Sequence, residues 1–265
     1  MRIMTWNIHG ASLGDRNERF PRIKQAIEKY RPDIACFQEA FFPTSREMLE
    51  SIEGYYVAYE TNWYPFPRFA ESTKGGLVTL INKERLVPFD ETKLVEINYN
   101  PYLTQGTWFT EQRWDRLIGK GFLETVIQDK EFGKITIINT HKVCTYTKNI
   151  DKYLEAQAEQ LLGRIRKHKE KGELIILAGD MNFSPQSKLY PAFRELLHEA
   201  TEGLQPALEN LRKMNLLGYE TIDYIFTGNK SHWQAQYVSH ESWPSEAKYP
   251  SDHPGICADV KPDNQ

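Results

Sequence analysis

The sequence contains few cysteines. Only three of its 265 residues are cysteine, Cys36, Cys144 and Cys257, and no pair has CxxC spacing. A sparse, odd set of this kind argues against a disulfide framework and against a structural zinc site. Cys36 and Cys257 lie in apolar runs, where we expect small buried side chains.

Long hydrophobic runs are also absent. The chain has no run of about 18 consecutive apolar residues, so we expect no transmembrane helix. The first ten residues, MRIMTWNIHG, contain an apolar run that is too short for a signal peptide and is interrupted by Asn7 and His9. We therefore expect a cytoplasmic protein, although an export signal removed before this point would leave no trace.

The sequence has no excess of positive charge. The net charge is −3 at pH 7, which gives no overall attraction to polyanions. A nucleic-acid enzyme would need a local basic groove instead. The densest basic run, residues 164–171, ends a predicted helix, where it complements the helix dipole.

Composition and periodicity indicate one globular domain. Hydrophobic residues make up 40% and charged residues 26%, as in soluble enzymes, and no linker, repeat or low-complexity tract interrupts the chain. Apolar periodicity predicts strands at 2–8, 33–39, 77–82, 121–128, 134–141, 174–179, 221–228 and after residue 255, and helices at 20–30, 154–172 and 188–198. We expect a single mixed α/β domain over residues 1–265.

The stretch LIILAGDMNFSP (174–185) places a carboxylate and an amide directly after a buried strand. In an extended segment, Asp180 and Asn182 would project from the same side. Residues at such strand ends face the crevice where open α/β folds bind ligands. Turn formation is the alternative, because Gly, Asp and Asn all favour turns.

Polar residues adjoin the other predicted strands in the same way. They are Asn7, Glu39, His141, Asp223, Asp252 and His253. Each alone can be a structural cap or a packing residue. Their recurrence at so many strand ends favours a shared site.

The ordered motifs TWN, QE, NTH, GDMN, IDYIF and SDH resemble the endonuclease/exonuclease/phosphatase superfamily, over residues 4 to 260. That resemblance implies a four-layered α/β sandwich, in which two mixed β-sheets pack face to face with helices outside. It also implies hydrolysis of a phosphodiester at one end of the sheets. Such chemistry needs a metal, an activated water and hydrogen-bond donors for the phosphoryl oxygens.

The resemblance also assigns roles at the metal side of the site. Glu39 is expected to ligate Mg²⁺, with Mn²⁺ as a substitute, because hard cations prefer oxygen ligands. Asn7 would be a second ligand or would orient the water on the metal. Asp180 would orient or deprotonate the attacking water, and Asn182 would hold the phosphate or that water.

A His–Asp pair is expected at the phosphate. Asp223 would fix the tautomer of His253 and raise its pKa, so that the pair acts as a base or as a positive clamp. His141 would donate to a non-bridging oxygen. Asp252 would ligate a second metal or support the first. His9 stands where apurinic-site endonucleases have an Asp, which puts the second metal in doubt.

The substrate class rests on weaker signals. Residues 113–127 resemble the segment of neutral sphingomyelinases in which Lys-Gly precedes the NTH strand, which favours lipid or small phosphodiesters. The aromatic segment 55–69 could stack bases or contact lipid, but an edge strand with a packed loop is the simpler interpretation. Substrate contacts are expected from Arg68, Lys74 and Arg113.

Two other functions stay open. The first is a DNA or RNA nuclease, including the apurinic-site and tyrosyl-DNA repair types. The second is an inactive binding module, which is disfavoured because every expected site position is filled. GDMNFSP lacks the Tyr-Arg that follows the Asn in inositol phosphatases, which disfavours that branch. We expect a monomer.

Overall fold

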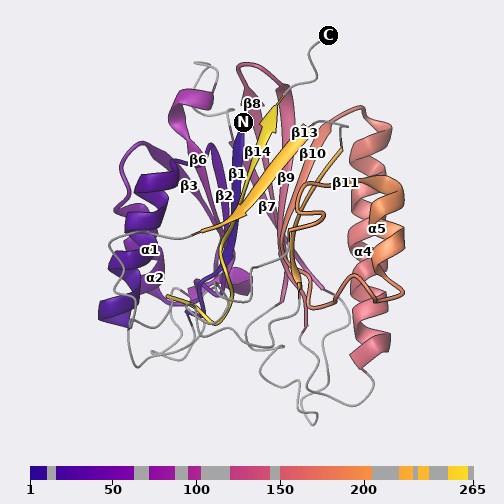
Figure 1. Ribbon diagram of the computed structural model, residues 1–265, viewed down its shortest axis with the longest axis horizontal. Helices are drawn as coiled ribbons and strands as arrows, with labels where there is room; N and C mark the ends of the chain where they lie inside the picture. The colour runs from indigo at the N-terminus through magenta and orange to yellow at the C-terminus, as the bar shows by residue number, and fades with distance from the viewer. Residues whose placement is uncertain are drawn as a thin grey trace.

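The protein is a sandwich of two six-stranded sheets with helices on both outer faces (Figure 1). The computed structural model describes residues 1–10, 16–62, 72–86, 95–102, 120–143, 150–204, 221–228, 232–238 and 250–261. Both sheets contain parallel and antiparallel neighbours. The predicted four-layered α/β sandwich is confirmed.

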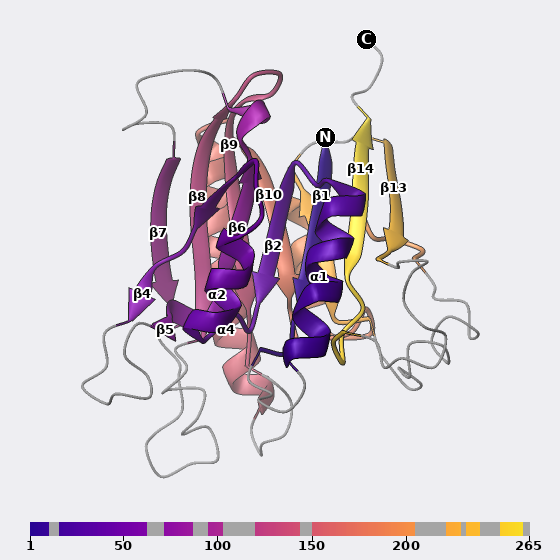
Figure 2. The same ribbon diagram turned by 90° about the vertical axis from the view of Figure 1, so that its left-hand side faces the viewer.

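The first sheet has the strand order β13-β14-β1-β2-β6-β3. Its strands are β1 (Arg2–Asn7), β2 (Ile34–Gln38), β3 (Tyr55–Ala58), β6 (Val78–Asn82), β13 (His232–Tyr237) and β14 (Ile256–Lys261). Helices α1 (Arg16–Tyr30) and α2 (Pro43–Glu50) cover its outer face (Figure 2). A small hairpin, β4 (Thr61–Asn62) with β5 (Ser72–Thr73), and the 3₁₀ turns η1 (Lys74–Gly76) and η2 (Lys83–Arg85) complete this half.

The second sheet has the order β11-β12-β10-β9-β8-β7. Its strands are β7 (Val95–Pro101), β8 (Gly121–Asp129), β9 (Gly133–His141), β10 (Leu174–Asp180), β11 (His198–Glu199) and β12 (Asp223–Thr227). Helices α4 (Ile150–Glu170) and α5 (Tyr190–Leu196) lie on its outer face (Figure 1). None of the helices in the described part of the chain has the length and apolarity needed to cross a membrane.

The elements predicted from periodicity are present with small shifts at their ends. Several elements were not predicted, among them α2, β7 and β13. The aromatic segment 55–69 begins with β3, an edge strand of the first sheet as expected, whereas residues 63–69 lie outside the described residues.

Strand alternation divides the apolar side chains into three layers. Ile3, Cys36 and Ile176 belong to the cluster between the two sheets. Met4 and Phe37, one position along their strands, pack with the helices on the first sheet. The equivalent alternation separates the inner face of the second sheet from the layer under α4 and α5. Each strand therefore sends alternate residues to the centre of the sandwich.

The same alternation gathers polar residues at one end of the central layer. Asp180 has the parity of Ile176 and so points between the sheets. Across the ladders it pairs in register with His141 on β9 and with Asp223 on β12. Strand register alone thus places a histidine and two carboxylates side by side.

Gly179 allows β10 to approach β9 at this point. Its φ of +146° is rarely adopted by side-chain-bearing residues, and a Cβ there would lie 2.0 Å from the carbonyl oxygen of Thr140. Only glycine fits the position without moving the strand that carries Asp180.

We predict that Gly179→Ala lowers the free energy of unfolding by at least about 2 kcal/mol, through the steric clash and the strained φ. Gly163→Ala is the matched control, because nothing lies within 4 Å of a Cβ at this position in α4. It should raise stability by about 0.5–1 kcal/mol. Urea unfolding of both variants checks this pair, and equal stability of the two would contradict the assignment.

Candidate active site

Asp180 is the centre of the polar cluster. Its side chain is 2% exposed, and its Oδ2 lies 3.1 Å from Asn7 Nδ2, 3.3 Å from His141 Nε2 and 3.8 Å from His253 Nε2. Burial alone would raise the pKa of this carboxyl. The hydrogen bond from His141 and the positive charges of His141, His253 and Lys120 outweigh burial and hold the pKa well below its ordinary value. Asp180 is therefore ionised at neutral pH.

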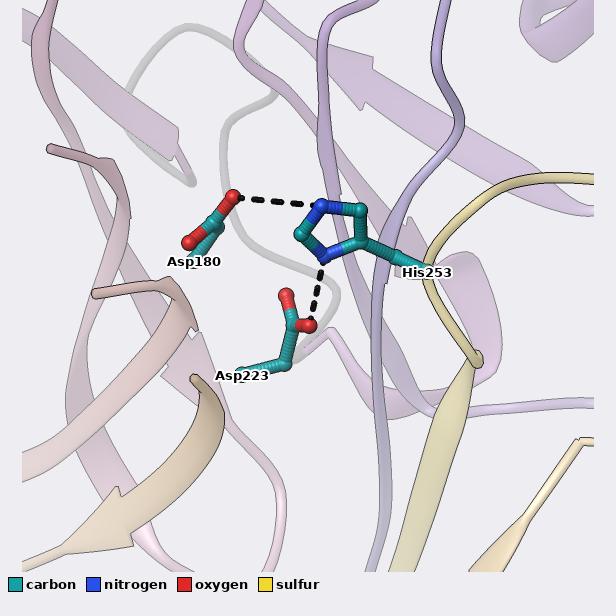
Figure 3. A group of neighbouring side chains, drawn as sticks. All are labelled: Asp180, Asp223 and His253. Carbon is teal, nitrogen blue, oxygen red and sulfur yellow. Dashed lines mark hydrogen bonds and ion pairs between the residues drawn. The ribbon is translucent and has the colours of Figure 1, made fainter. Parts of the chain in front are cut away.

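His253 lies between Asp180 and Asp223, as Figure 3 shows. Its Nδ1 is 2.8 Å from Oδ2 of Asp223, whose side chain is fully buried. Burial lowers the pKa of the imidazole, but the charge and hydrogen bond of Asp223 and the charge of Asp180 raise it to about 10. The ring is thus an imidazolium at neutral pH, and its Nε2–H faces Asp180.

Asn7 connects this group to Glu39. Its Oδ1 accepts a hydrogen bond from the His9 backbone N–H at 3.0 Å, which turns Nδ2 toward Asp180 and, at 3.4 Å, toward Glu39 Oε1. His9 adopts a left-handed φ of 47°, and its Nδ1 lies 3.2 Å from Oδ2 of Asp252. The hydrogen bond with Asp252 raises the pKa of His9, against the effect of burial.

The Glu39 carboxylate fits a hard cation. Its side chain is 18% exposed, and the Asn7 contact at 3.4 Å is its shortest polar approach among the described residues, with His9 and His141 at 3.9 Å. A carboxylate without a close donor retains lone pairs for a metal such as Mg²⁺. Asp180, Asp223 and His253 also have ligand atoms within 4.8 Å of one another.

Asn182 differs from the sequence expectation. The strand ends at Asp180, and Asn182 adopts a left-handed φ of 50°, so the two residues do not belong to one extended segment. The Asn182 N–H donates to Asp180 Oδ1 at 2.9 Å, which is an Asx turn, and its Nδ2 donates to the Lys142 carbonyl at 2.9 Å. Turn formation and site formation are therefore properties of the same residues.

Two contributors were not among the predicted site residues. Lys120 is buried, and its Nζ lies 2.9 Å from His141 Nδ1. Ser251 donates from Oγ to the Asn7 carbonyl at 2.6 Å and accepts from the His253 N–H at 3.2 Å. In the sequence these residues appear as the Lys of Lys120-Gly121, at the start of β8, and as the Ser of the SDH motif. Neither signal indicates these contacts by itself.

The structure does not test the three residues that we expect to contact the substrate. Lys74 pairs with Glu60, with 2.6 Å between Nζ and Oε2. Arg68 and Arg113 lie outside the described residues. Asp252, with a side chain 57% exposed, lies at the mouth of the cluster next to His9. The roles of these residues stay predictions.

Acids and histidines from both sheets meet at one end of the sandwich. The chain belongs to the Endonuclease/Exonuclease/phosphatase family, whose profile matches residues 4–253. Members of this family hydrolyse phosphoester bonds and are generally dependent on divalent metals.

Comparison with individual proteins gives more distant relatives. The inositol phosphosphingolipids phospholipase C of Schizosaccharomyces pombe is 25% identical over 192 residues, which are 71% of this chain and 42% of that protein. The chain thus spans less than half the length of this relative.

Solved structures share the fold at lower identity. Caenorhabditis elegans TDP2 has a TM-score of 0.71 at 17% identity, covering 98% of this chain and 96% of the other. SmcL also has a TM-score of 0.71, at 20% identity, covering 98% and 99%. The human Nocturnin catalytic domain has a TM-score of 0.65 at 20% identity, covering 98% and 94%.

A buried lysine, Lys142, follows His141 in the chain, and its backbone bonds to Asp180 and Asn182. Lys142 is fully buried, its Nζ lies 4.5 Å from the centre of the Phe183 ring, and no hydrogen-bond partner reaches that amine from the described residues. Burial lowers its pKa from 10.5 to about 7, although the charge of Asp180 opposes the shift. The unfolded chain therefore binds this proton more tightly than the folded protein does.

We predict that Lys142→Met stabilises the fold at pH 7. Between the folded pKa of about 7 and the unfolded value of 10.5, the unfolded state binds more protons, so the stability of the parent rises with pH. The advantage of the variant should therefore shrink toward pH 10. Urea unfolding from pH 6 to 9.5 measures this, with Lys130→Met, an exposed site, as control. A variant less stable than the parent at pH 7 would contradict the burial argument.

Proposed function

We propose that this protein is a metal-dependent phosphodiester hydrolase that attacks phosphorus with an activated water. The observation that carries the proposal is the contrast between two neighbouring carboxylates. Asp180 is buried and compensated by two histidines, whereas Glu39 is partly open, and its nearest donor in the described part of the chain is Asn7 Nδ2 at 3.4 Å. Paired carboxylates in different environments support different roles in one reaction.

Glu39 would hold Mg²⁺ or Mn²⁺, with Asn7 and Asp252 beside it. The bound ion would supply positive charge that polarises the phosphoryl group. Asn7 keeps its amide between Glu39 and Asp180 because the His9 N–H fixes the amide orientation. It therefore links the metal side of the site to the water side.

Asp180 would accept a hydrogen bond from the attacking water and orient it. Because its pKa is low, positioning rather than strong base catalysis is its expected contribution. His253, held as an imidazolium by Asp223, would donate from Nε2 to a phosphoryl oxygen. His141 would donate to another such oxygen. The water oxygen would form a bond to phosphorus as the bond to the ester oxygen breaks. The proton that the water loses would pass to solvent, and the leaving oxygen would take up a proton from solvent.

Asn182 would support the reaction in two ways, through its backbone N–H and through its side-chain amide. Its backbone N–H fixes one oxygen of Asp180, which leaves Oδ2 directed at Asn7 and the histidines. One hydrogen of the Asn182 side-chain amide bonds the Lys142 carbonyl. The predicted contact with phosphate would use the other hydrogen of that amide. Lys120, buried beside His141, adds positive charge that favours an anionic substrate.

We predict that activity needs Mg²⁺ or Mn²⁺ and that Glu39→Gln raises the metal concentration for half-maximal rate, because one ligand charge is lost. High metal should restore part of the rate. Glu47→Gln, an exposed acid on α2, is the control and should titrate like the parent. Full parent activity in excess EDTA would exclude the metal-dependent proposal.

We predict that Asp180→Asn and His253→Ala each lower kcat by roughly 10²–10⁴-fold, since positioned acid–base groups contribute this much. The two side chains are in contact, so the double variant should be little slower than either single variant. Steady-state kinetics with circular dichroism spectra of each variant measures this. Near-parent rates in both single variants would place the site elsewhere.

For the substrate, we propose a lipid or small phosphodiester. The 25% identical relative is named for phospholipase C activity on inositol phosphosphingolipids. The net charge of −3 disfavours long duplex nucleic acid, whose binders neutralise several phosphates with Lys and Arg. Gly76 packs against Glu39, since a Cβ there would be 3.1 Å from Glu39 Cα, and Lys74 lies two residues earlier in the chain. A monomeric, cytoplasmic enzyme stays our expectation.

We predict a higher kcat/KM on sphingomyelin or lysophospholipid micelles than on plasmid or abasic duplex, compared in one buffer at physiological salt. Asp180→Asn is included in each assay, so that contaminating hydrolases are recognised. Faster incision of DNA by the parent alone would assign the protein to the nuclease branch. Hydrolysis of neither class would remove the proposed substrate assignment.

A further inference from the structure

Two segments from opposite ends of the chain meet beside the cluster. Residues 7–10 comprise the last residue of β1 and the turn after it, and residues 250–253 precede β14. The first segment carries Asn7 and His9, and the second carries Asp252 and His253. The distances within the cluster depend on how these two segments are held together.

Arg19 of α1 contacts both segments. Its guanidinium donates from Nη1 to the carbonyls of Ile8 at 3.1 Å and Pro250 at 3.2 Å, and from Nη2 to the carbonyl of His9 at 3.2 Å. The residue is 4% exposed. A buried cation on three backbone carbonyls joins a helix on the outer face to both loops.

The contact extends to Glu39 through the backbone. A Cβ at Gly10 would lie 2.0 Å from the Glu39 carbonyl oxygen, so the backbone at Gly10 packs directly against the backbone of Glu39. Glu39 itself has a left-handed φ of 62°, and the Ile8 N–H bonds to the Gln38 carbonyl at 3.1 Å. A shift of residues 8–10 would therefore move Glu39 as well as Asn7.

We propose that Arg19 is a positioning residue for the hydrolase site, which it serves by fixing residues 8–10 and 250 at the distance that the cluster requires. Within the described part of the chain, it bonds the carbonyls of Ile8, His9 and Pro250 and acts through them. The expected effect of Arg19 on the rate of hydrolysis rests on the proposed function. Its expected effect on the positions of the two segments does not.

Arginine suits this place better than lysine. The planar guanidinium presents several donors in a fixed fork, so one side chain can hold carbonyls from two segments at once. A lysine ammonium at the end of a flexible stem has no such preset geometry. An apolar side chain of similar volume would leave the carbonyls of Ile8, His9 and Pro250 without these hydrogen bonds, so the two segments would lose the contacts that join them.

The test compares Arg19→Met, Arg19→Lys and the matched control Arg85→Met. Arg85 is also a partly buried arginine, and it bonds Asp129 and Glu131 at the β8–β9 hairpin, the end of β9 opposite His141. Three kinds of measurement are made. Kinetics gives kcat, KM and the half-saturating Mg²⁺ concentration, thermal unfolding gives stability, and hydrogen exchange follows the His9 and His253 amides. Asp180→Asn serves as the inactive reference.

We expect Arg19→Met to lower kcat on the order of 10²-fold, because displacement of catalytic groups by about 1 Å has this effect. It should also raise the half-saturating Mg²⁺ concentration and speed amide exchange at His9 and His253. Arg19→Lys should be intermediate. Arg85→Met should lose stability but keep parent kcat per folded molecule and parent exchange at both amides.

Loss of stability in Arg19→Met with parent kcat and parent exchange at the two segments would overturn the proposal. If Arg19→Met does not fold, Arg19→Lys decides: reduced kcat with faster exchange supports the proposal, and parent values in both overturn it. If the parent itself hydrolyses no phosphodiester, the proposed function fails, and the exchange measurement still tests whether Arg19 holds the two segments.

Discussion

The arrangement depends on one buried carboxylate. Asp180 lies between the two sheets with a side chain 2% exposed, and an ionised group at such a place is very costly without partners. Its partners come from β9, from the end of β1 and from the segment before β14. The cluster is therefore complete only when both sheets have packed together, and the charge balance at Asp180 couples folding to the assembly of the site.

Environment separates the roles of the acids. Asp223 is fully buried and bonded to His253, Asp180 is shared between two histidines and an amide, and Glu39 has no donor closer than 3.4 Å among the described residues. The first acid sets the charge of a histidine, the second suits a water, and the third suits a metal. Lys142 shows the accompanying cost: its backbone N–H bonds the Asp180 carbonyl, while its buried amine lies over the Phe183 ring with no hydrogen-bond partner among the described residues.

The sequence predicted the central strands, the α/β class and the polar strand ends, because strand alternation and the end of an apolar run are local signals. The four-layered sandwich came from family resemblance. The left-handed conformation of Asn182, the contacts of Ser251 and the reach of Arg19 from α1 were not predictable, since each depends on segments distant in the chain. Strands β7 and β13 lie at sheet edges, where the apolar pattern is weaker.

The central claim is that this cluster directs water to phosphorus. Hydrolysis of bis-p-nitrophenyl phosphate in ¹⁸O-labelled water with Mg²⁺, followed by mass spectrometry of both products, tests it directly. The account predicts label in the phosphomonoester and none in p-nitrophenol, with product formation abolished by Asp180→Asn. Label in p-nitrophenol, or an equal labelling rate in Asp180→Asn, would contradict it.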